Sequence, residues 1–160
     1  MVKMKNKEFK IGKKTEDNFK KLFLQTIDAT KEEDIKEHWD VKVLLNDKEV
    51  KIDVKSIKKL NRYDVVYNEN FHWVELKNVR GEDGWLYGDS DLIAFEIEEY
   101  FILVGRLKLK RFIEKKVKNK EITYSKTLYT KYQRKGRKDI IVLTKTIDLI
   151  MISYDIIKKF

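Results

Sequence analysis

Two short stretches in which apolar and polar residues alternate constrain this chain more than any other feature. They are "WDVKVLL" (residues 39–45) and "VKIDVKSI" (residues 50–57), and the polar tetrapeptide "NDKE" lies between them. Alternation with a period of two residues is typical of a strand that buries one face, and a short polar connection between two such runs predicts a β-hairpin. A hairpin also determines which residues of the two strands face one another.

The rest of the chain predicts helices and further strands around this hairpin. Residues 15–27 are expected to form an amphipathic helix, with Thr15 as its N-cap and Glu16 in its first turn. The other expected elements are a strand over 71–79, a glycine-rich loop over 80–91, a short helix over 90–97, a buried strand over 100–105, a basic amphipathic helix over 106–120, a strand over 140–144 and a short helix over 155–160. The sequence therefore predicts an α/β fold with a mixed central sheet flanked by helices.

Length and composition limit the class of protein. The length of 160 residues suits a single domain over residues 1–160. Cysteine is absent, which excludes disulfides, cysteine-based zinc sites and a cysteine nucleophile. No apolar run approaches the ~18 residues of a transmembrane candidate, and no apolar segment follows the basic N-terminus as it would in a signal peptide. We therefore expect an intracellular, cytoplasmic protein without a membrane partner.

Positive charge is concentrated in one segment. Residues 106–138 hold 14 Lys and Arg against two Glu, a net charge of +12, whereas the whole chain carries +9. Such segregation is expected of a protein that binds a polyanion, although a solvated basic face would have the same composition. Basic side chains suit phosphate contacts and aromatic rings can stack on unpaired bases. The candidates for nucleic-acid binding are Lys131, Arg134, Lys135, Arg137, Lys138, Tyr129, Tyr132 and Trp85.

The predicted hairpin brings acidic residues together at one end. Asp40 begins the first strand, and Asp53 and Lys55 lie on one face of the second strand. Facing residues of paired strands have Cβ atoms ~4.5–5.5 Å apart, so the carboxyl groups of Asp40 and Asp53 can approach one another. Two such carboxylates repel unless a cation lies between them, and Mg²⁺ suits oxygen ligands of this kind. Glu16 could add a third carboxylate, whereas an ordinary surface ion pair is the alternative for Asp53 and Lys55.

Glu16, Asp40 and the tripeptide Asp53-Val54-Lys55 resemble the active-site signature of the PD-(D/E)XK nuclease superfamily. The gaps of 24 residues from Glu16 to Asp40 and 13 residues from Asp40 to Asp53 are similar to those in Holliday-junction-resolvase-like members. The stretch "WVELKNVRGEDGWLYGDSDLIAFE" resembles phage-encoded members in particular. The resemblance covers roughly residues 15–115 and implies a restriction-endonuclease-like core.

The same resemblance implies a metal-dependent nuclease, an endonuclease rather than an exonuclease. It would hydrolyse phosphodiester bonds of DNA, with branched DNA or a junction as candidate substrates and RNA still open. Asp40, Asp53 and Glu16 would bind Mg²⁺, for which Mn²⁺ can substitute, and Lys55 would orient a water molecule or stabilise developing charge. A homodimer and a phage or bacterial origin are both compatible with this resemblance.

Alternatives remain for the signature and for the function. A second match takes Asp53 as the strand Asp and Glu75-Leu76-Lys77 as the D/E-x-K pair, so Glu75 and Lys77 are accessory candidates. The chain could also be a non-catalytic nucleic-acid-binding domain on the same fold, or an interaction protein with an acidic partner. Carboxylates at positions 40 and 53 argue against a pure binder, because acids that face phosphates weaken binding.

Overall fold

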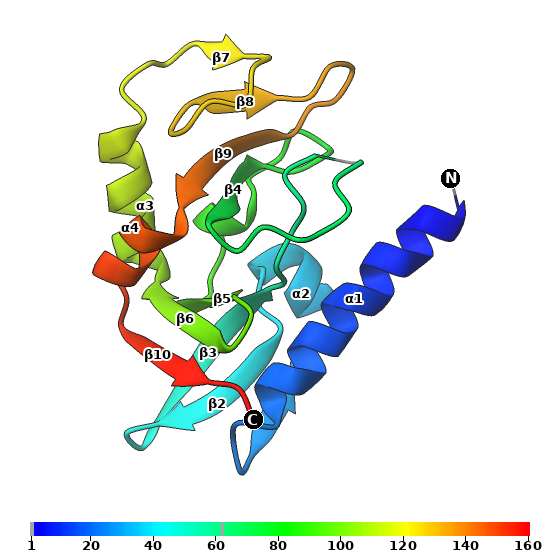
Figure 1. Cartoon of the computed structure of the whole chain (residues 1–160). Coiled ribbons are helices and arrows are strands. Elements are labelled where there is room, and N and C mark those ends of the chain that lie inside the picture. Colours follow the sequence, from blue (N-terminus) through cyan, green and yellow to red (C-terminus); the bar gives the residue numbers. More distant parts are fainter. Residues whose placement is uncertain (1, 62) are drawn as a thin grey trace.

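The computed structural model describes residues 2–61 and 63–160, which form two β-sheets and the helices packed against them (Figure 1). In chain order the elements are α1 (Val2–Lys20), β1 (Thr26–Asp28), α2 (Lys31–Glu37), β2 (Val41–Leu45), β3 (Lys48–Lys55), β4 (Phe71–Lys77), the 3₁₀ helix η1 (Trp85–Tyr87), β5 (Leu92–Glu96), β6 (Tyr100–Gly105), α3 (Arg106–Lys116), β7 (Ile122–Thr123), β8 (Lys131–Gln133), β9 (Ile140–Lys145), α4 (Thr146–Met151) and β10 (Asp155–Lys158).

The first sheet is mixed and contains the predicted hairpin. Its strand order is β1-β2-β3-β5-β6-β10. Strands β2 and β3 pair antiparallel with Val41 opposite Ile52, whereas β3 and β5 run parallel. The remaining neighbours in this sheet are antiparallel. The α/β class with a mixed sheet and flanking helices is therefore confirmed at this level of detail.

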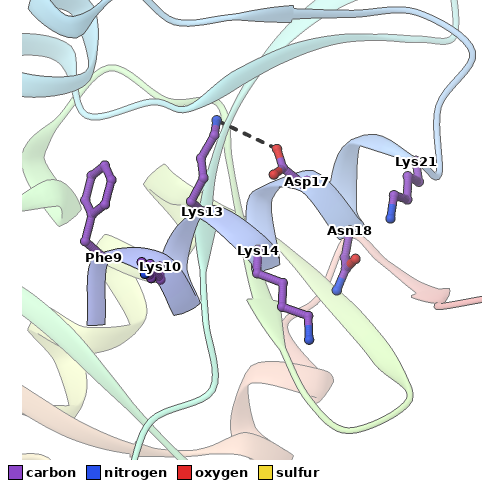
Figure 2. Close-up of a pocket in the computed structure, with 7 residues that line it drawn as sticks. All are labelled: Phe9, Lys10, Lys13, Lys14, Asp17, Asn18 and Lys21. Atoms are coloured by element: carbon purple, nitrogen blue, oxygen red, sulfur yellow. Dashed lines mark ion pairs between the residues drawn. The ribbon is translucent and has the colours of Figure 1, made fainter. Parts of the chain in front are cut away.

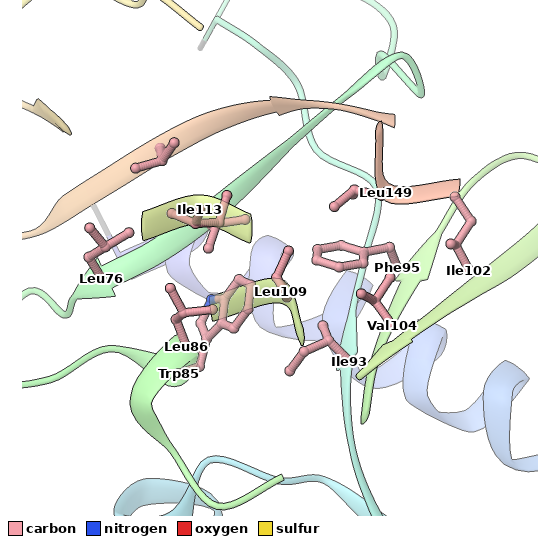
Figure 3. Packing of buried hydrophobic residues seen from close by; sticks show 12 residues of the cluster. Leu76, Trp85, Leu86, Ile93, Phe95, Ile102, Val104, Leu109, Ile113 and Leu149 are labelled. Carbon is pink, nitrogen blue, oxygen red and sulfur yellow. The ribbon is translucent and has the colours of Figure 1, made fainter. Parts of the chain in front are cut away.

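A second sheet packs over one face of the first. Its order is β4-β9-β8-β7. The buried cluster between the two sheets also includes residues of η1, α3 and α4, such as Leu86, Leu109 and Leu149 (Figure 3). The members of this cluster from the strands are Val74, Leu76, Ile93, Phe95, Ile102, Val104 and Val142. This packing matters for function, because residues on the inner face of β3 point toward the second sheet.

Helix α1 covers the opposite face of the first sheet. Its Phe19 is fully buried and meets the ring of Phe101 edge-on, with 5.0 Å between the ring centroids. Strand β5 supplies Leu92 and Ala94 to this side and alternate residues to the other side. The predicted helix over 90–97 is therefore wrong. A strand buried on both faces has no polar alternation, so its sequence cannot be told from a short buried helix.

The two ends of the chain also differ from the prediction. The expected helix over 15–27 is α1, which spans Val2–Lys20 and places Thr15 in its interior, where the hydroxyl donates to the carbonyl of Ile11. Thr15 is therefore not an N-cap, and Glu16 lies near the end of the helix. The lysine-rich first half of α1 has no apolar stripe that could reveal it. The expected helix over 155–160 is strand β10, because the free edge of β6 supplies backbone partners there.

The polar segment before β2 contains a helix that periodicity did not reveal. Helix α2 begins with a capping box, in which Thr30 accepts from the N–H of Glu33 and the Glu33 carboxylate accepts from the N–H of Thr30. The basic helix predicted over 106–120 is confirmed as α3, which ends at Lys116, so the last four residues of the predicted range lie outside the helix. Within the described residues, no helix is both long and apolar enough to cross a membrane.

Candidate active site

Strand β3 aims Asp53 and Lys55 at the second sheet. Ile52 and Val54 pack on the α1 side of the sheet, so the residues between and after them face the other way. Asp53 is buried, with 2% of its surface exposed. The Nζ atom of Lys55 lies 2.6 Å from Oδ1 of Asp53, and 27% of the Lys55 side chain is exposed. Lys55 can therefore reach solvent, whereas Asp53 cannot.

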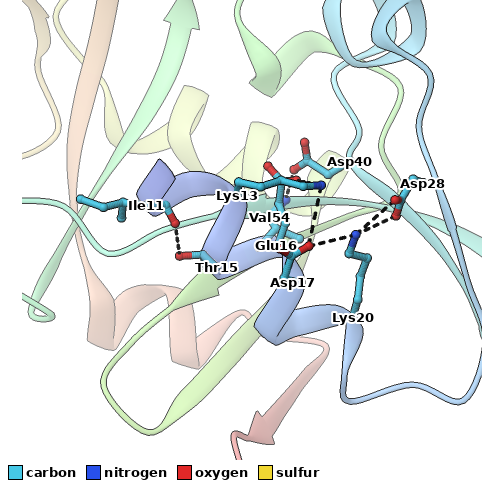
Figure 4. Close-up of polar contacts among 9 residues, drawn as sticks. All are labelled: Ile11, Lys13, Thr15, Glu16, Asp17, Lys20, Asp28, Asp40 and Val54. Atoms are coloured by element: carbon cyan, nitrogen blue, oxygen red, sulfur yellow. Dashed lines mark hydrogen bonds and ion pairs between the residues drawn. The ribbon is translucent and has the colours of Figure 1, made fainter. Parts of the chain in front are cut away.

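Asp40 is fixed beside this pair by the end of the hairpin. Its backbone N–H donates to the carbonyl of Ile52 over 2.9 Å, which continues the β2–β3 ladder by one residue. Its Oδ2 atom accepts the backbone N–H of Val54 over 2.7 Å (Figure 4). The carboxylate is thus bound to the backbone between Asp53 and Lys55. Strand pairing predicts that Asp40 approaches Asp53. The hydrogen bond from Val54 holds the Asp40 carboxylate there.

The buried Asp53 carboxyl group lacks a partner for one of its oxygens. No donor in the described part of the chain bonds its Oδ2 atom. Burial raises the pKa of Asp53 well above its usual range; the Lys55 ammonium lowers it, and the negative charge of Asp40 raises it again. Burial lowers the pKa of Lys55, but the carboxylates of Asp53, Asp40 and Glu75 outweigh burial and the net shift is upward. The site therefore favours a proton or a cation at Asp53.

Helix α1 contributes Glu16 to the same cluster. The pKa of Glu16 is raised, first by burial and then by the negative charge of Asp40. Lys13, one turn earlier, lies 3.4 Å from the Glu16 carboxylate and partly offsets this shift. Figure 4 shows Glu16 and Lys13 projecting from α1 toward Asp40. The predicted third carboxylate therefore interacts with Asp40, although it comes from the end of the helix and from the face of the sheet opposite to Asp53.

Asp34 of α2 is a member that sequence reasoning missed. Its pKa is raised by partial loss of hydration, although the residue is exposed, and by the negative charge of Asp40; the positive charges of Lys55 and His38 lower it. Residues 28–37 carry no clear apolar period, so the sequence pattern predicts neither α2 nor the place of Asp34 in the fold. The capping-box pattern of Thr30 and Glu33 is the signal that could have revealed this helix.

The accessory candidates Glu75 and Lys77 separate in the structure. Burial raises the pKa of Glu75, while the Lys55 ammonium and the backbone N–H of Trp85 lower it. Lys77 is exposed and donates to the carbonyl of Gly81 over 3.3 Å. A register irregularity in β4 falls between the two residues. Glu75 therefore belongs to the same cluster as Asp53 and Lys55, and Lys77 does not.

Several of the predicted nucleic-acid contacts have structural partners. Trp85 is only 7% exposed and packs edge-on against Phe95, so a base cannot stack on its ring in this conformation. The hydroxyl of Tyr129 donates to Asp148. The ring of Tyr132 lies against Trp73.

The basic candidates divide into paired and exposed side chains. Arg134 donates from Nε to the buried carboxylate of Asp139 over 2.9 Å. Lys131 is half-buried on strand β8. Lys135, Arg137 and Lys138 are exposed in the turn between β8 and β9. These last three are the basic candidates best placed to meet a phosphate.

The donor set can be tested against a divalent cation. Among the described residues, no three His, Asp or Glu side chains are grouped as metal ligands. Two carboxylates are present side by side, and Mg²⁺ commonly binds one or two carboxylates together with water and substrate phosphate. The buried, unpartnered Oδ2 of Asp53 fits such a cation. A hollow of about 370 Å³ lies elsewhere, along the α1 residues that include Phe9, Lys14 and Lys21 (Figure 2), and contains none of these acids.

Comparisons with protein-family models, with curated proteins and with solved structures find no match to this chain.

Proposed function

We propose that the chain is a metal-dependent nuclease that hydrolyses phosphodiester bonds of DNA on a restriction-endonuclease-like core. The observation that carries this proposal is the buried Asp53 carboxyl group, which has an unpartnered oxygen next to Asp40 and a lysine 2.6 Å from its other oxygen. Two adjacent acids with a neighbouring ammonium suit phosphoryl chemistry, because a phosphate and its cation complete the charge balance.

The surrounding charges support the same reading. Glu16, Asp34, Asp53 and Glu75 have raised pKa values, and Asp40 or Lys55 contributes to each shift. They come from two helices and from strands of both sheets. Carboxyl groups with raised pKa values gather more often at functional sites than elsewhere, and this supports an active site here.

Each residue would have a distinct role. Asp40 and Asp53 would hold Mg²⁺ or Mn²⁺, with Glu16 at the edge of the site, and the bound ion would polarise the scissile phosphate and lower the pKa of water. Asp53 also holds Lys55 by its Oδ1 atom. The Lys55 ammonium, which is partly exposed, would orient the attacking water or stabilise charge that develops on the phosphate. Exposed Lys135, Arg137 and Lys138 would contact phosphates away from the scissile bond.

The fold supports the proposal through one local arrangement. Helix α1 precedes a hairpin that carries Asp40, Asp53 and Lys55, and β3 pairs parallel with β5 in a mixed sheet. This order is the reason for including a restriction-endonuclease-like core, which the sequence resemblance implies, in the proposal. Branched DNA as the substrate and a homodimer as the assembly are parts of the proposal that cleavage and sedimentation experiments can decide.

A non-catalytic nucleic-acid-binding domain is the second candidate. It is favoured by the lack of three grouped metal ligands among the described residues. In that case Asp53 and Lys55 would be a buried ion pair, and binding would show a steep salt dependence without any effect of metal.

The test is cleavage of a labelled panel of duplex DNA, single-stranded DNA, a fork and a four-way junction, with single-stranded RNA added. Each substrate is incubated with Mg²⁺, Mn²⁺ or EDTA. We expect metal-dependent cleavage that Asp53→Asn abolishes. The matched control is Asp47→Asn, which changes an exposed acid in the turn of the same hairpin, where φ is 62° and Asn is well tolerated. Binding without cleavage in either metal would overturn the catalytic proposal.

A further inference from the structure

The glycine-rich loop 84–88 is wedged between β4 and the end of α2. A Cβ atom on Gly84 would lie 2.6 Å from the carbonyl oxygen and 2.8 Å from Cγ of Glu75. A Cβ atom on Gly88 would lie 2.7 Å from the carbonyl oxygen of Glu37 and 2.7 Å from Cβ of His38. The loop is also bonded at both ends, from the N–H of Gly84 to Leu76 and from the N–H of Asp89 to Glu37. Its position against β4 and α2 is therefore fixed.

This fixed loop places the Trp85 ring next to Lys55. The Nζ atom of Lys55 lies 4.9 Å from the centroid of the Trp85 ring and 2.6 Å from Oδ1 of Asp53. The indole is held by burial in the cluster between the two sheets, with Phe95 6.0 Å away between ring centroids (Figure 3). A tryptophan face attracts a cation more strongly than any other side-chain ring. Lys55 thus contacts two groups, Asp53 and Trp85, that are both buried.

We propose that Trp85 is a positioning residue of the site, whose ring holds the Lys55 ammonium beside Asp53. The role of Trp85 in catalysis rests on the proposed function, whereas its hold on Lys55 rests on the cation–π contact alone. Trp85 is 7% exposed, so it acts through Lys55 and does not touch the substrate. A lysine side chain has many rotamers, and holding it in one of them preserves the geometry that the reaction needs.

The first test measures Lys55 without any substrate. The hydrogen-exchange rate of its ammonium group is measured by ¹H–¹⁵N NMR at one pH, with the resonance assigned from Lys55→Arg. We expect exchange to be about two- to fivefold faster in Trp85→Leu, the change in equilibrium that a cation–π contact of this kind represents. Lys159 is the internal control, because it pairs with Glu96 at 2.8 Å and lies 5.1 Å from the Phe101 ring centroid. Its rate should not change.

A second variant series keeps the shape of the ring, in case Trp85→Leu does not fold. Fluorinated tryptophans weaken the attraction of the ring for a cation while filling nearly the same volume. Fluorinated tryptophan would replace all three tryptophans of the chain, but the measured quantity, hydrogen exchange of the Lys55 ammonium, reports on Lys55 alone. Exchange of the Lys55 ammonium should accelerate stepwise with the number of fluorines. Unchanged Lys55 exchange in this series would overturn the proposal and leave Trp85 as a core residue only.

The kinetic test uses cleavage by the variants. We expect Trp85→Leu to lower kcat severalfold with KM unchanged, and Trp85→Phe to recover most of the loss, because Phe retains a ring face. A raised KM with unchanged kcat would instead make Trp85 a substrate contact and overturn the positioning role. If the unmodified chain does not cleave, the proposed function fails, and the exchange experiment still decides whether Trp85 holds Lys55.

Discussion

Replacing Gly84 by alanine tests the packing that fixes the site. The φ and ψ angles of Gly84 are −81° and 177°, which any residue adopts, so the cost of Gly84→Ala is steric. The new Cβ would lie 2.6 Å from the carbonyl oxygen of Glu75, whereas close carbon–oxygen contacts are ~3.3 Å, so loop or strand must shift by ~0.7 Å. Overpacking of this kind costs ~1–3 kcal/mol.

The unfolded chain offsets part of this cost. Alanine has less conformational freedom than glycine in the unfolded state, which stabilises the folded protein by ~0.4–1 kcal/mol. We therefore expect a net loss of ~1–2 kcal/mol in the free energy of unfolding for Gly84→Ala. For a chain of this size that loss lowers Tm by ~2–8 °C. Cleavage should fall as well, because the shift moves the Glu75 backbone and the support of Lys55.

Gly12→Ala is the matched control with the opposite sign. Gly12 lies in α1, and a Cβ atom there would meet nothing within 4 Å. Alanine in a helix interior is more favourable than glycine by ~0.5–1 kcal/mol, so Tm should rise by ~1–4 °C. Both variants are measured by thermal and urea unfolding under identical conditions. A Gly84→Ala protein as stable as the unmodified chain, beside a stabilised Gly12→Ala, would refute the close packing of the loop on β4.

Three further predictions concern charge. In metal-free buffer the raised pKa of Asp53 means that its contribution to stability is full below pH ~4 and is lost as pH rises through the pKa of the folded state. In urea unfolding, Asp53→Asn should therefore gain stability relative to the unmodified chain as pH rises. Added Mg²⁺ should narrow that difference. Burial lowers the pKa of His72 from about 6.5 to about 4, so its contribution to stability is full above pH 6.5 and is lost as pH falls toward 4. The free energy of unfolding should fall by ~3 kcal/mol over that pH range in the unmodified chain, and His72→Leu should not show this fall. Replacing exposed Lys135, Arg137 and Lys138 together by alanine should weaken DNA binding and reduce the slope of its logarithmic salt dependence by ~3, with Tm unchanged; an unchanged slope would remove this turn from the interface.

The hairpin could be predicted because both of its signals are local, although its strands are Val41–Leu45 and Lys48–Lys55 where 39–45 and 50–57 were expected. Alternation identified β2 and β3, and the polar turn set a register in which Asp40 approaches Asp53. The same logic failed for β5, because Leu92 and Ile93 are both buried, on opposite faces of the sheet, and leave no alternation to detect. It also failed for the first half of α1, which has few apolar residues to pack and no stripe to reveal them.

The remainder of the site depends on contacts between the two sheets. Glu75 reaches Lys55 only because the second sheet stacks over the first, and no local pattern encodes that stacking. The separation of Glu75 from Lys77 comes from a register irregularity in β4, whereas strict alternation would place both on one face. The sequence alone allows base stacking and burial equally for Trp85, and its burial accompanies the close approach of Gly84 to β4.

The path of the chain between the two sheets has a consequence for cooperativity. The chain builds β1, β2 and β3 in the first sheet, crosses to the second for β4, and returns for β5 and β6. It crosses again for β7, β8 and β9, and then adds β10 to the first sheet. Any single cut between β1 and β10 divides the strands of the first sheet between two fragments, so nicking a loop there would not yield two independently folding halves. Unfolding should therefore be one transition, in which Asp53 and Glu75 lose their shared surroundings at the same step.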